Sequence, residues 1–345
     1  MSGTSCDGID LAYCRFTHSR HNQWEFAINE AETIPYDRQW QKRLSAAINL
    51  NQRDIEPFNL SYTALLNRVI LEFIDRKEIT ELDLICSHGH TVWHKPEQGL
   101  TFQIGNLSLV AQNMPCPVVC DFRIQDVALG GQGAPLVPIG DQLLFNDFDA
   151  CINLGGFANI SYSTKEGSMI AFDLCPFNIV LNYWAQKLGE NFDKNGHFAS
   201  SGVVHEALLS ELNSLAYYTQ KPPKSLGLEW ALSHIYPLYQ KYKLRPQDWL
   251  ATAATHMVTQ VQQWAKNFDR ILITGGGAYN GFILDRLAEV APGKFTLPEP
   301  QLIDYKEALV FGLLGVLRYR DEVNTLASVT GASRSHSAGV IWMPY

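Results

Sequence analysis

Three short glycine-containing turns limit the possible folds of this chain more than any other feature. They comprise residues 3–5 (GTS), 154–156 (LGG) and 274–277 (TGGG), and each adjoins an apolar segment. Glycine lets backbone N–H groups approach a ligand closely and hydroxyls add donors, so such turns can wrap a phosphate and its metal ion. Tight-turn geometry alone also explains any single one, and the first ten residues taken alone favour a disordered terminus. Their recurrence favours two consecutive units of one kind that grip phosphate.

None of these turns has the sequence of a common nucleotide-binding loop. No Gly-Lys-Ser or Gly-Lys-Thr triplet follows any of them, which argues against a P-loop. Gly275 and Gly277 fit the first two positions of GxGxxG, but Asn280 stands at the third, so a dinucleotide-binding fingerprint is also absent. A different nucleotide fold is therefore expected.

The hydrophobic pattern predicts two α/β units in succession. In the first, residues 9–17 and 23–32 read as antiparallel strands, and LDLIC, LTFQIG and PVVCDF as short strands with a short helix near 106–113. Helices are expected near 37–49 and after a cap at Asn59 or Ser61, where apolar residues recur at helical spacing.

The second unit is expected to begin near residue 130. It contains the predicted strands ACINLGGFANISYS and SMIAFDLC, and helices at NIVLNYWAQKL, near 202–218 and near 247–266, followed by the strand, turn and helix of RILITGGGAYNGFILDRLAEV. KEALVFGLLGVLRYR is apolar nearly all round and is predicted to be a buried helix. The predicted domains are 1–128 with 325–345, and 129–324, with the cleft between them as the natural ligand site.

Charge and cysteine content exclude several classes of function. The 345-residue chain has 46% hydrophobic and 18% charged residues and a formal net charge of −8, so it is a packed globular protein that would repel nucleic acid. Its seven cysteines are an odd number and several lie in apolar strands, which indicates a reducing compartment. No CxxC pair, signal peptide or long apolar run occurs, so we expect a cytoplasmic protein without a structural metal or membrane partner.

Asp173 is the carboxylate best placed for catalysis. It ends a predicted strand, several residues before the helix that begins near Asn178, and so is early for a helix cap, although a capping role stays open. A carboxylate at a strand end that faces a cleft can take a proton from an attacking hydroxyl or water.

Two other polar clusters are candidates for ligand contacts. Asp121, Arg123 and Asp126 follow a buried strand, but Arg123 and Asp126 also read as a surface ion pair. His88, His90 and His94 in CSHGHTVWH have no complementary carboxylate nearby, so hydrogen bonding to a substrate or loop is favoured over metal ligation.

The order of the motifs resembles that of the anhydro-N-acetylmuramic acid kinases over nearly the whole chain. The matching segments are MSGTSCDGID, SHGHTVWH, TFQIGN, DFRIQDVALGGQGAPLVP, INLGGFANIS, KPPKSLGLEW, ITGGGAYN, KEALVFGLLG and SVTGAS. The resemblance implies an α/β fold of two related actin-like (ribonuclease H-like) domains that close on ATP. It also implies conversion of anhydro-N-acetylmuramic acid, ATP and water into N-acetylmuramic acid 6-phosphate and ADP during cell-wall recycling, with Mg²⁺ as cofactor and a homodimer as the common assembly.

The resemblance also implies roles for individual residues. Asp173 falls on the position of the catalytic base, and His88, Arg123, Asp126 and Glu307 fall on motifs at or near the sugar pocket. The implied ATP contacts are Gly3, Thr4, Ser5, Asp7, Gly8 and Asp10 in the first phosphate motif, Gly155 and Gly156 in the second, and Gly275, Gly276 and Gly277 on the adenosine side.

The sequence departs from the family pattern in three places. Leu174-Cys175-Pro176-Phe177 replaces the Thr-Gly-Pro-Gly that usually follows the catalytic aspartate, which predicts a reshaped sugar pocket. Leu226 and Leu228 stand where Thr and Arg are more usual. Family members also carry a short apolar strand ahead of MSGTS, so we expect the start at Met1 to be a truncation or a misassigned initiation site, and an extension to improve ATP affinity.

These departures leave two alternatives to the leading interpretation. One is a kinase for another anhydro-sugar such as levoglucosan, which lacks the lactyl group and acetamido nitrogen. The other is a non-catalytic actin-like protein that binds nucleotide without turning over a sugar.

Overall fold

The structure is a computed structural model that describes residues 1–3, 6–20 and 23–345, and it divides into two compact units. Unit 1 comprises residues 1–144 and 305–345, and unit 2 comprises residues 145–304. The predicted phosphate contacts Thr4 and Ser5 lie outside the described residues.

The unit boundaries differ from the expected ones after residues 128 and 324. Residues 129–144 belong to unit 1 because α4 (Pro138–Leu144) packs on α12 (Pro300–Tyr319), where the Val310 methyls lie 2.6 Å from the position that a Gly140 Cβ would take. A buried ion pair of 2.7 Å between Lys306 and Asp141 joins the same two helices. Such a pair between distant segments leaves no local signal in the sequence.

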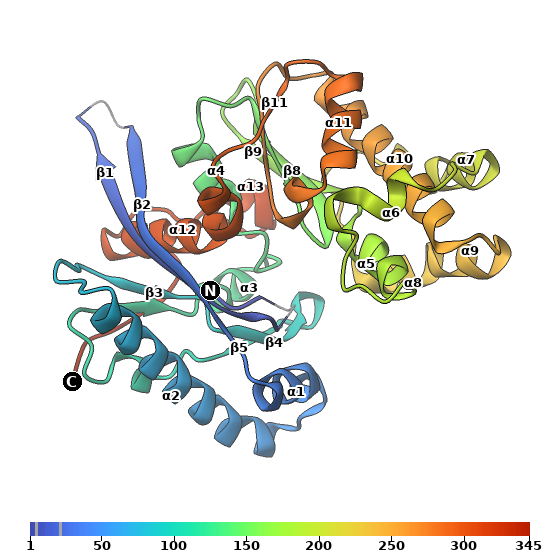
Figure 1. Ribbon diagram of the computed structural model, residues 1–345. Coiled ribbons are helices and arrows are strands. Elements are labelled where there is room, and N and C mark those ends of the chain that lie inside the picture. Colours follow the sequence, from blue (N-terminus) through green and yellow to red (C-terminus); the bar gives the residue numbers. More distant parts are fainter. Residues whose placement is uncertain (4–5, 21–22) are drawn as a thin grey trace. The chain divides into compact units, whose positions relative to one another are not determined.

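Over its described residues, unit 1 contains three small sheets with strand orders β1-β2, β12-β6-β3 and β4-β5. Its strands are β1 (Gly8–His18), β2 (Trp24–Pro35), β3 (Ile85–Ser87), β4 (His90–Lys95), β5 (Leu100–Ile104), β6 (Val118–Cys120) and β12 (Val340–Trp342). Its helices, besides α4 and most of α12, are α1 (Arg38–Ala46), α2 (Gln52–Arg76), α3 (Ile124–Ala128) and α13 (Ala327–Thr330). Figure 1 shows α2 running beside β5 in this unit.

The long helix α2 begins earlier than predicted. Its cap is Asn51, whose side-chain oxygen accepts hydrogen bonds from the N–H groups of Arg53 and Asp54, so the predicted cap at Asn59 or Ser61 is wrong. The Asn59 side-chain oxygen instead accepts the Gly105 N–H at 2.8 Å and ties the helix to the end of β5. Most residues in the first turns of α2 are polar, so the apolar spacing did not indicate that the helix begins at Gln52.

Unit 2 is built on one sheet of five strands in the order β11-β10-β7-β8-β9. β7 pairs antiparallel with β8 and parallel with β10, which confirms the predicted mixed α/β class and is the strand arrangement of a ribonuclease H-like domain. The strands are β7 (Ala150–Leu154), β8 (Phe157–Ser163), β9 (Met169–Pro176), β10 (Ile271–Thr274) and β11 (Phe295–Thr296). The helices are α5 (Asn178–Gln186), α6 (His197–Ser200), α7 (Glu206–Asn213), α8 (Leu228–His234), α9 (Tyr236–Lys241), α10 (Pro246–Ala265) and α11 (Gly281–Val290).

Two predicted elements of unit 2 are divided in the structure. ACINLGGFANISYS forms two strands because the chain reverses at Gly155 and Gly156. The predicted helix near 202–218 is present as α7 and a short 3-10 turn (Ala216–Thr219); α7 begins late because the His205 side chain accepts the Leu208 N–H and caps the helix there.

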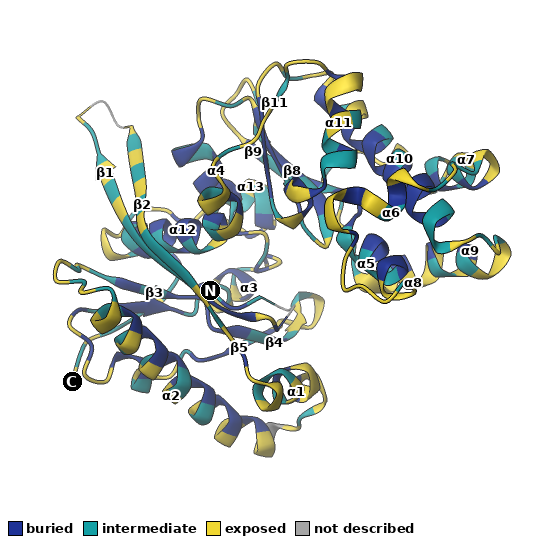
Figure 2. Cartoon of the chain, viewed as in Figure 1, coloured by how far each residue is buried: buried dark blue, intermediate teal, exposed yellow. Residues whose placement is uncertain are grey.

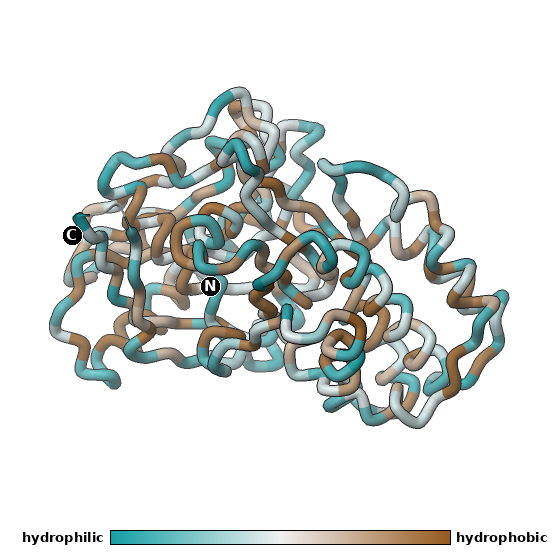
Figure 3. The backbone as a smooth tube through the Cα atoms, turned by 90° about the horizontal axis from the view of Figure 1, so that it is seen from above, coloured by the Kyte–Doolittle hydropathy of each residue, from teal (hydrophilic) through white to brown (hydrophobic). Residues whose placement is uncertain are grey.

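Each unit has its own core. α12 is buried in unit 1 at Leu309, Val310, Leu313 and Leu314, as its all-round apolar pattern predicts. In unit 2 the core lies between the sheet and α5, α10 and α11, and Figure 2 shows much of α10, β8 and β9 as buried. Figure 3 shows apolar stretches inside each unit and hydrophilic residues along loops and helix ends.

The described helices include none whose length and apolar character would suit a membrane span. All seven cysteines are free thiols.

Candidate active site

A row of polar side chains crosses four neighbouring strands of unit 2. Thr274 on β10 is in register with Asn153 on β7, which faces Asn159 on β8, which in turn faces Asp173 on β9. Residues in register project to the same face of a sheet, so these four groups form one line. The row brings three hydrogen-bonding side chains beside the predicted catalytic carboxylate.

The two glycine turns of unit 2 meet around the side chain of Asn153. A Cβ on Gly155 would lie 3.0 Å from Asn153 Nδ2, and one on Gly275, where φ is +82°, would lie 2.4 Å from Asn153 Oδ1. Gly277 approaches the backbone of Leu154 so closely that its Cβ would lie 2.9 Å from the Leu154 carbonyl oxygen. Because Gly155 and Gly275 have no side chains, the backbones of both turns can lie close to the Asn153 amide.

The start of α5 is fastened to the first of these turns. The N–H groups of Phe177 and Asn178 donate to the carbonyl oxygens of Gly156 and Gly155 at 2.9 and 3.2 Å, and Asn178 Nδ2 donates to the Leu154 carbonyl. The predicted ATP contacts Gly155, Gly156 and the Gly275–Gly277 turn thus gather at one edge of the sheet.

Asp173 does not cap α5. Its Oδ2 accepts the Leu226 N–H at 2.7 Å, and its carbonyl oxygen accepts the Tyr217 hydroxyl, also at 2.7 Å. The residue that precedes α5 is Phe177, which offers no capping side chain. Burial raises the pKa of the Asp173 carboxyl to about 6, against the opposing effect of the Leu226 hydrogen bond. A carboxylate with this pKa is suited to act as a base near neutral pH.

The two bulky residues after Asp173 fill the core and not the site. Cys175 and Phe177 are fully buried, and the Phe177 ring lies against Gly277. These two side chains therefore give no support to the expectation of a reshaped sugar pocket. Both side chains belong to a core cluster of apolar residues that also includes Trp184 and Ala278.

The loop that carries Leu226 and Leu228 contributes through its backbone. The Leu226 N–H holds Asp173, whereas Leu228 begins α8 and is 52% exposed. Sequence reasoning missed the Leu226 contact because a backbone N–H has no residue signature. The segment KPPKSLG lies close to β9, some fifty residues earlier in the chain, only because the tertiary fold brings them together.

In unit 1, Arg123 is held in place by His88 and a loop carbonyl. Arg123 Nε donates to His88 Nε2 at 2.7 Å, and Nη1 donates to the Gly133 carbonyl at 2.6 Å. Burial, then the positive charge of Arg123, hold the pKa of His88 well below its usual value, so His88 is neutral and its proton sits on Nδ1, which donates to the Gly89 carbonyl. Both members of the pair are predicted sugar contacts.

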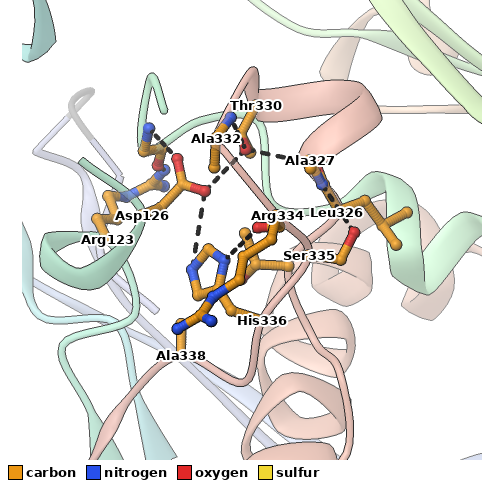
Figure 4. Close-up of polar contacts among 12 residues, drawn as sticks. Arg123, Asp126, Leu326, Ala327, Thr330, Ala332, Arg334, Ser335, His336 and Ala338 are labelled. Carbon is orange, nitrogen blue, oxygen red and sulfur yellow. Dashed lines mark hydrogen bonds and ion pairs between the residues drawn. The ribbon is translucent and has the colours of Figure 1, made fainter. Parts of the chain in front are cut away.

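Asp126 is bonded inside unit 1. Its side chain is fully buried and accepts the Gly133 N–H and the Thr330 hydroxyl, each at 2.7 Å, with His336 Nε2 3.8 Å away. Figure 4 shows Thr330 and His336 directed at its carboxylate. This arrangement favours a structural role that joins the loop after α3 to the end of α13, and the fully buried carboxylate has no exposed surface to offer a sugar.

Glu307 shares the electrostatic surroundings of Arg123. Burial raises the pKa of its carboxyl although part of the side chain stays accessible, and the charges of Arg123 and the Met1 amino group oppose that shift. Glu307 is exposed, so its carboxylate is accessible to a ligand while it feels the positive charge of Arg123.

The described part of the first glycine loop lies at the start of β1. Gly3 accepts the Cys6 N–H, Asp7 is exposed, and Gly8 approaches β2 so closely that a Cβ would lie 2.6 Å from the Ile34 carbonyl oxygen. Asp10 accepts the Thr33 hydroxyl at 2.7 Å. A carboxylate and several backbone groups therefore stand at this end of the hairpin.

The other histidines of the predicted cluster are engaged within unit 1. His90 Nδ1 lies 3.0 Å from the Ser2 hydroxyl, and burial lowers its pKa to about 4. His94 Nδ1 lies 3.1 Å from the Thr101 hydroxyl. Across the described residues, no group of three or more His, Cys, Asp or Glu side chains is arranged to hold a metal ion.

Comparison with known proteins identifies relatives along the full length of the chain. The profile of the family described as "Anhydro-N-acetylmuramic acid kinase" matches residues 1–344. Proteins of that name from Xanthomonas oryzae pv. oryzae and Pasteurella multocida are 34% and 33% identical, over 99% of this chain and 96% and 95% of theirs.

Among solved structures, the ADPNP-bound activator of 2-hydroxyisocaproyl-CoA dehydratase from Clostridium difficile is 16% identical, with a TM-score of 0.32 over 50% of this chain and 66% of that one. This score indicates a distant likeness only. The match of the family over 344 residues, with relatives that align from end to end, shows that the chain belongs to the anhydro-N-acetylmuramic acid kinase family.

Proposed function

We propose that this protein converts 1,6-anhydro-N-acetylmuramic acid, ATP and water into N-acetylmuramic acid 6-phosphate and ADP. The observation that carries the proposal is the polar row ending at Asp173 beside two glycine turns that close on Asn153. This arrangement supports the proposal because it brings a carboxylate and two glycine turns, whose backbone groups suit phosphate binding, to neighbouring strands of a single sheet.

Asp173 is the proposed base. Its carboxylate takes a proton from water, the water oxygen bonds to C1 of the sugar, and the bond from C1 to O6 breaks. The released O6 then bonds to the γ-phosphorus of ATP as the bond to ADP breaks. The Leu226 N–H fixes the carboxylate oxygen Oδ2 and leaves Oδ1 for the water. One carboxylate is enough because O6 stays attached to the sugar and needs no separate acid once it attacks phosphorus.

The glycine turns and Asp10 are proposed to hold the phosphates. Phosphoryl transfer needs mainly positioning and neutralisation of charge. Mg²⁺ prefers one or two carboxylates together with phosphate oxygens and waters, which fits a chain whose described residues form no all-protein metal cage. Asp10 would hold the ion, which supplies neutralisation of the phosphate charge.

Arg123 and Glu307 are proposed to contact the sugar. Arg123 uses Nε and Nη1 within unit 1, so its position is fixed before any ligand arrives. A fixed guanidinium suits the lactyl carboxylate of the substrate, and Glu307 suits a hydroxyl or amide donor.

The reaction is proposed to take place in the cytoplasm, because ATP is a cytoplasmic metabolite. A homodimer remains a prediction.

The rate should depend on pH through Asp173. The base must be ionised, and burial raises its pKa to about 6, so kcat/KM should fall about tenfold per pH unit below pH 6 and level off above it. Steady-state rates from pH 5 to 8 measure this. Burial also raises the pKa of Asp121 to about 6, so Asp121→Asn is the control. Persistence of the acid limb in that variant supports Asp173, and its disappearance contradicts the assignment.

Release of ADP tests the substrate directly. The protein should release ADP with anhydro-N-acetylmuramic acid, at a rate at least about tenfold above that with levoglucosan or with no sugar. Equal release with levoglucosan would favour the broader anhydro-sugar kinase. No sugar-dependent release, in a protein that still binds ATP, would contradict the proposed reaction.

A further inference from the structure

The polar row of unit 2 lies on the face of the sheet that is turned away from the apolar core. Successive residues of a strand point to opposite faces. Ala158 and Ile160, the two neighbours of Asn159 on β8, are fully buried in that core. Phe172, which precedes Asp173 on β9, belongs to the same core. Asn159 and Asp173 therefore project together from the other face, where both are half-buried.

A β-bulge follows this pair of residues directly. Asn159 is in register with Asp173. The preceding residue of β8, Ala158, is in register with Cys175, so Leu174 is an extra residue in β9. Bulges are common beside active sites, where they aim a side chain. Since Leu174 and Cys175 are both buried in the core, the bulge ends the regular ladder just after Asn159 and Asp173.

The side-chain amide of Asn159 is available to a ligand. Within the part of the chain that the structure describes, it makes no hydrogen bond to another residue, whereas Oδ2 of Asp173 accepts the Leu226 N–H. An asparagine amide carries two N–H donors and an acceptor oxygen. A molecule above the polar row would therefore meet an amide donor one strand away from the carboxylate.

Asn159 lies between the proposed base and the turns that are proposed to hold phosphate. Neighbouring strands lie about 4.8 Å apart, so Asn153, which the glycine turns adjoin, is about 10 Å from Asp173 along the row. The proposed reaction spans a similar distance. It needs a hydrogen bond from base to water, near-attack contacts of about 3–3.5 Å from water to C1 and from O6 to phosphorus, and the C1–O6 bond between them. The C1–O6 bond is therefore expected above Asn159.

We propose that Asn159 is a further catalytic residue, whose Nδ2 donates a hydrogen bond to O6 of the sugar as the C1–O6 bond breaks. This inference rests on the proposed function. As the water oxygen bonds to C1 and its proton passes to Asp173, the electron pair of the C1–O6 bond moves to O6. A fixed donor stabilises the negative charge that develops there. O6 then bonds to the γ-phosphorus, and ADP leaves with the electron pair of its own bond.

An amide suits this position because it donates a hydrogen bond and keeps its proton. A carboxylic acid or an imidazolium would transfer its proton to O6 and weaken O6 as a nucleophile toward phosphorus. In the bound substrate O6 is an uncharged ether oxygen, so its hydrogen bond to Asn159 is weak. The contact strengthens only as charge develops, and it should therefore raise kcat with little effect on binding.

Asn159→Leu tests the donor, because leucine has nearly the shape of asparagine but no N–H group. It should lower kcat for sugar-dependent ADP formation by about 10²-fold or more, as loss of one oxyanion donor does. The Kd of the sugar, measured by calorimetry with a nonhydrolysable ATP analogue, should change by less than about threefold. Asn159→Ser keeps a hydroxyl donor on a shorter side chain and should recover part of the rate.

Asn267→Leu is the matched control. Asn267 is exposed after α10 in the same unit and lies outside the polar row, so this variant should keep the wild-type kcat. A Tm within about 3 °C of the wild type shows that each variant is folded. The acid limb assigned to Asp173 should stay within about half a pH unit of its wild-type position in Asn159→Leu, because only a displaced carboxylate would titrate elsewhere.

Three results would overturn the inference while the proposed function stands. One is a kcat for Asn159→Leu within about threefold of the wild type, and another is a loss of sugar binding with kcat unchanged. The third is a lower kcat with a shifted acid limb, which would assign the effect to displacement of Asp173. Failure of the proposed function differs from all three, because the wild-type protein would then form no ADP in response to the sugar, and both proposals would fall.

Discussion

Replacing Asp173 with asparagine is expected to lower the rate of sugar phosphorylation by about 10³-fold while leaving ATP binding within about twofold. Asparagine keeps the shape of the side chain and can still accept the Leu226 N–H, but it cannot take a proton from water. Single-turnover ADP formation and a separate nucleotide titration distinguish the two effects.

Asp285→Asn is the matched control for this substitution. Asp285 is an exposed carboxylate on α11 of the same unit, so its loss changes charge equally without touching the polar row. The control should keep full activity. If Asp173→Asn retained more than about a tenth of the wild-type rate, proton transfer to Asp173 would not be the main catalytic step.

Gly277→Ala is expected to destabilise the protein by about 3 kcal/mol and to reduce ATP binding with it. A Cβ there would lie 2.5 Å from the Phe177 ring, 2.6 Å from Leu154 Cβ and 2.9 Å from the Leu154 carbonyl oxygen. Since one of these neighbours is backbone, the two glycine turns would have to separate. Urea unfolding of the variant measures the loss.

The neighbouring glycine supplies the control. A Cβ on Gly276 would have Asn178 Nδ2 at 3.7 Å as its nearest neighbour, which is ordinary van der Waals contact. Gly276→Ala should therefore change the free energy of unfolding by less than about 1 kcal/mol. Equal losses in the two variants would mean that the turn resists any side chain, independently of its contact with Leu154.

The sequence was sufficient where structure depends on local pattern. The β1–β2 hairpin, α10 and the buried α12 were all predicted from apolar spacing, because one face or every face of these elements meets a core. The apolar run before Asp173 correctly predicted a strand, but the expectation that Asp173 ends that strand is wrong, because β9 continues to Pro176.

Features that depend on contacts between distant segments were not predictable. The hydrogen bond from the Leu226 N–H to Asp173 is made by a backbone group, so no residue type in the sequence marks it. The ion pair between Lys306 and Asp141 joins segments far apart in the sequence, and it helps to include residues 129–144 in unit 1. The hydrogen bond from Thr330 to Asp126 also joins distant segments of unit 1. The roles of Cys175 and Phe177 were misjudged for the same reason, because only the packed core shows which way each side chain points.

The fixed tautomer of His88 has a consequence for interpreting rate measurements. An acid limb near pH 6 is commonly attributed to imidazole, whose free pKa is about 6.5. Here burial lowers the pKa of His90 to about 4 and that of His256 to about 3, and His88 lies well below its free value beside a cation. These three rings are expected to stay uncharged through the whole interval, so an inflection at pH 6 would not come from them and would fit the carboxyl of Asp173, whose pKa burial raises to about 6.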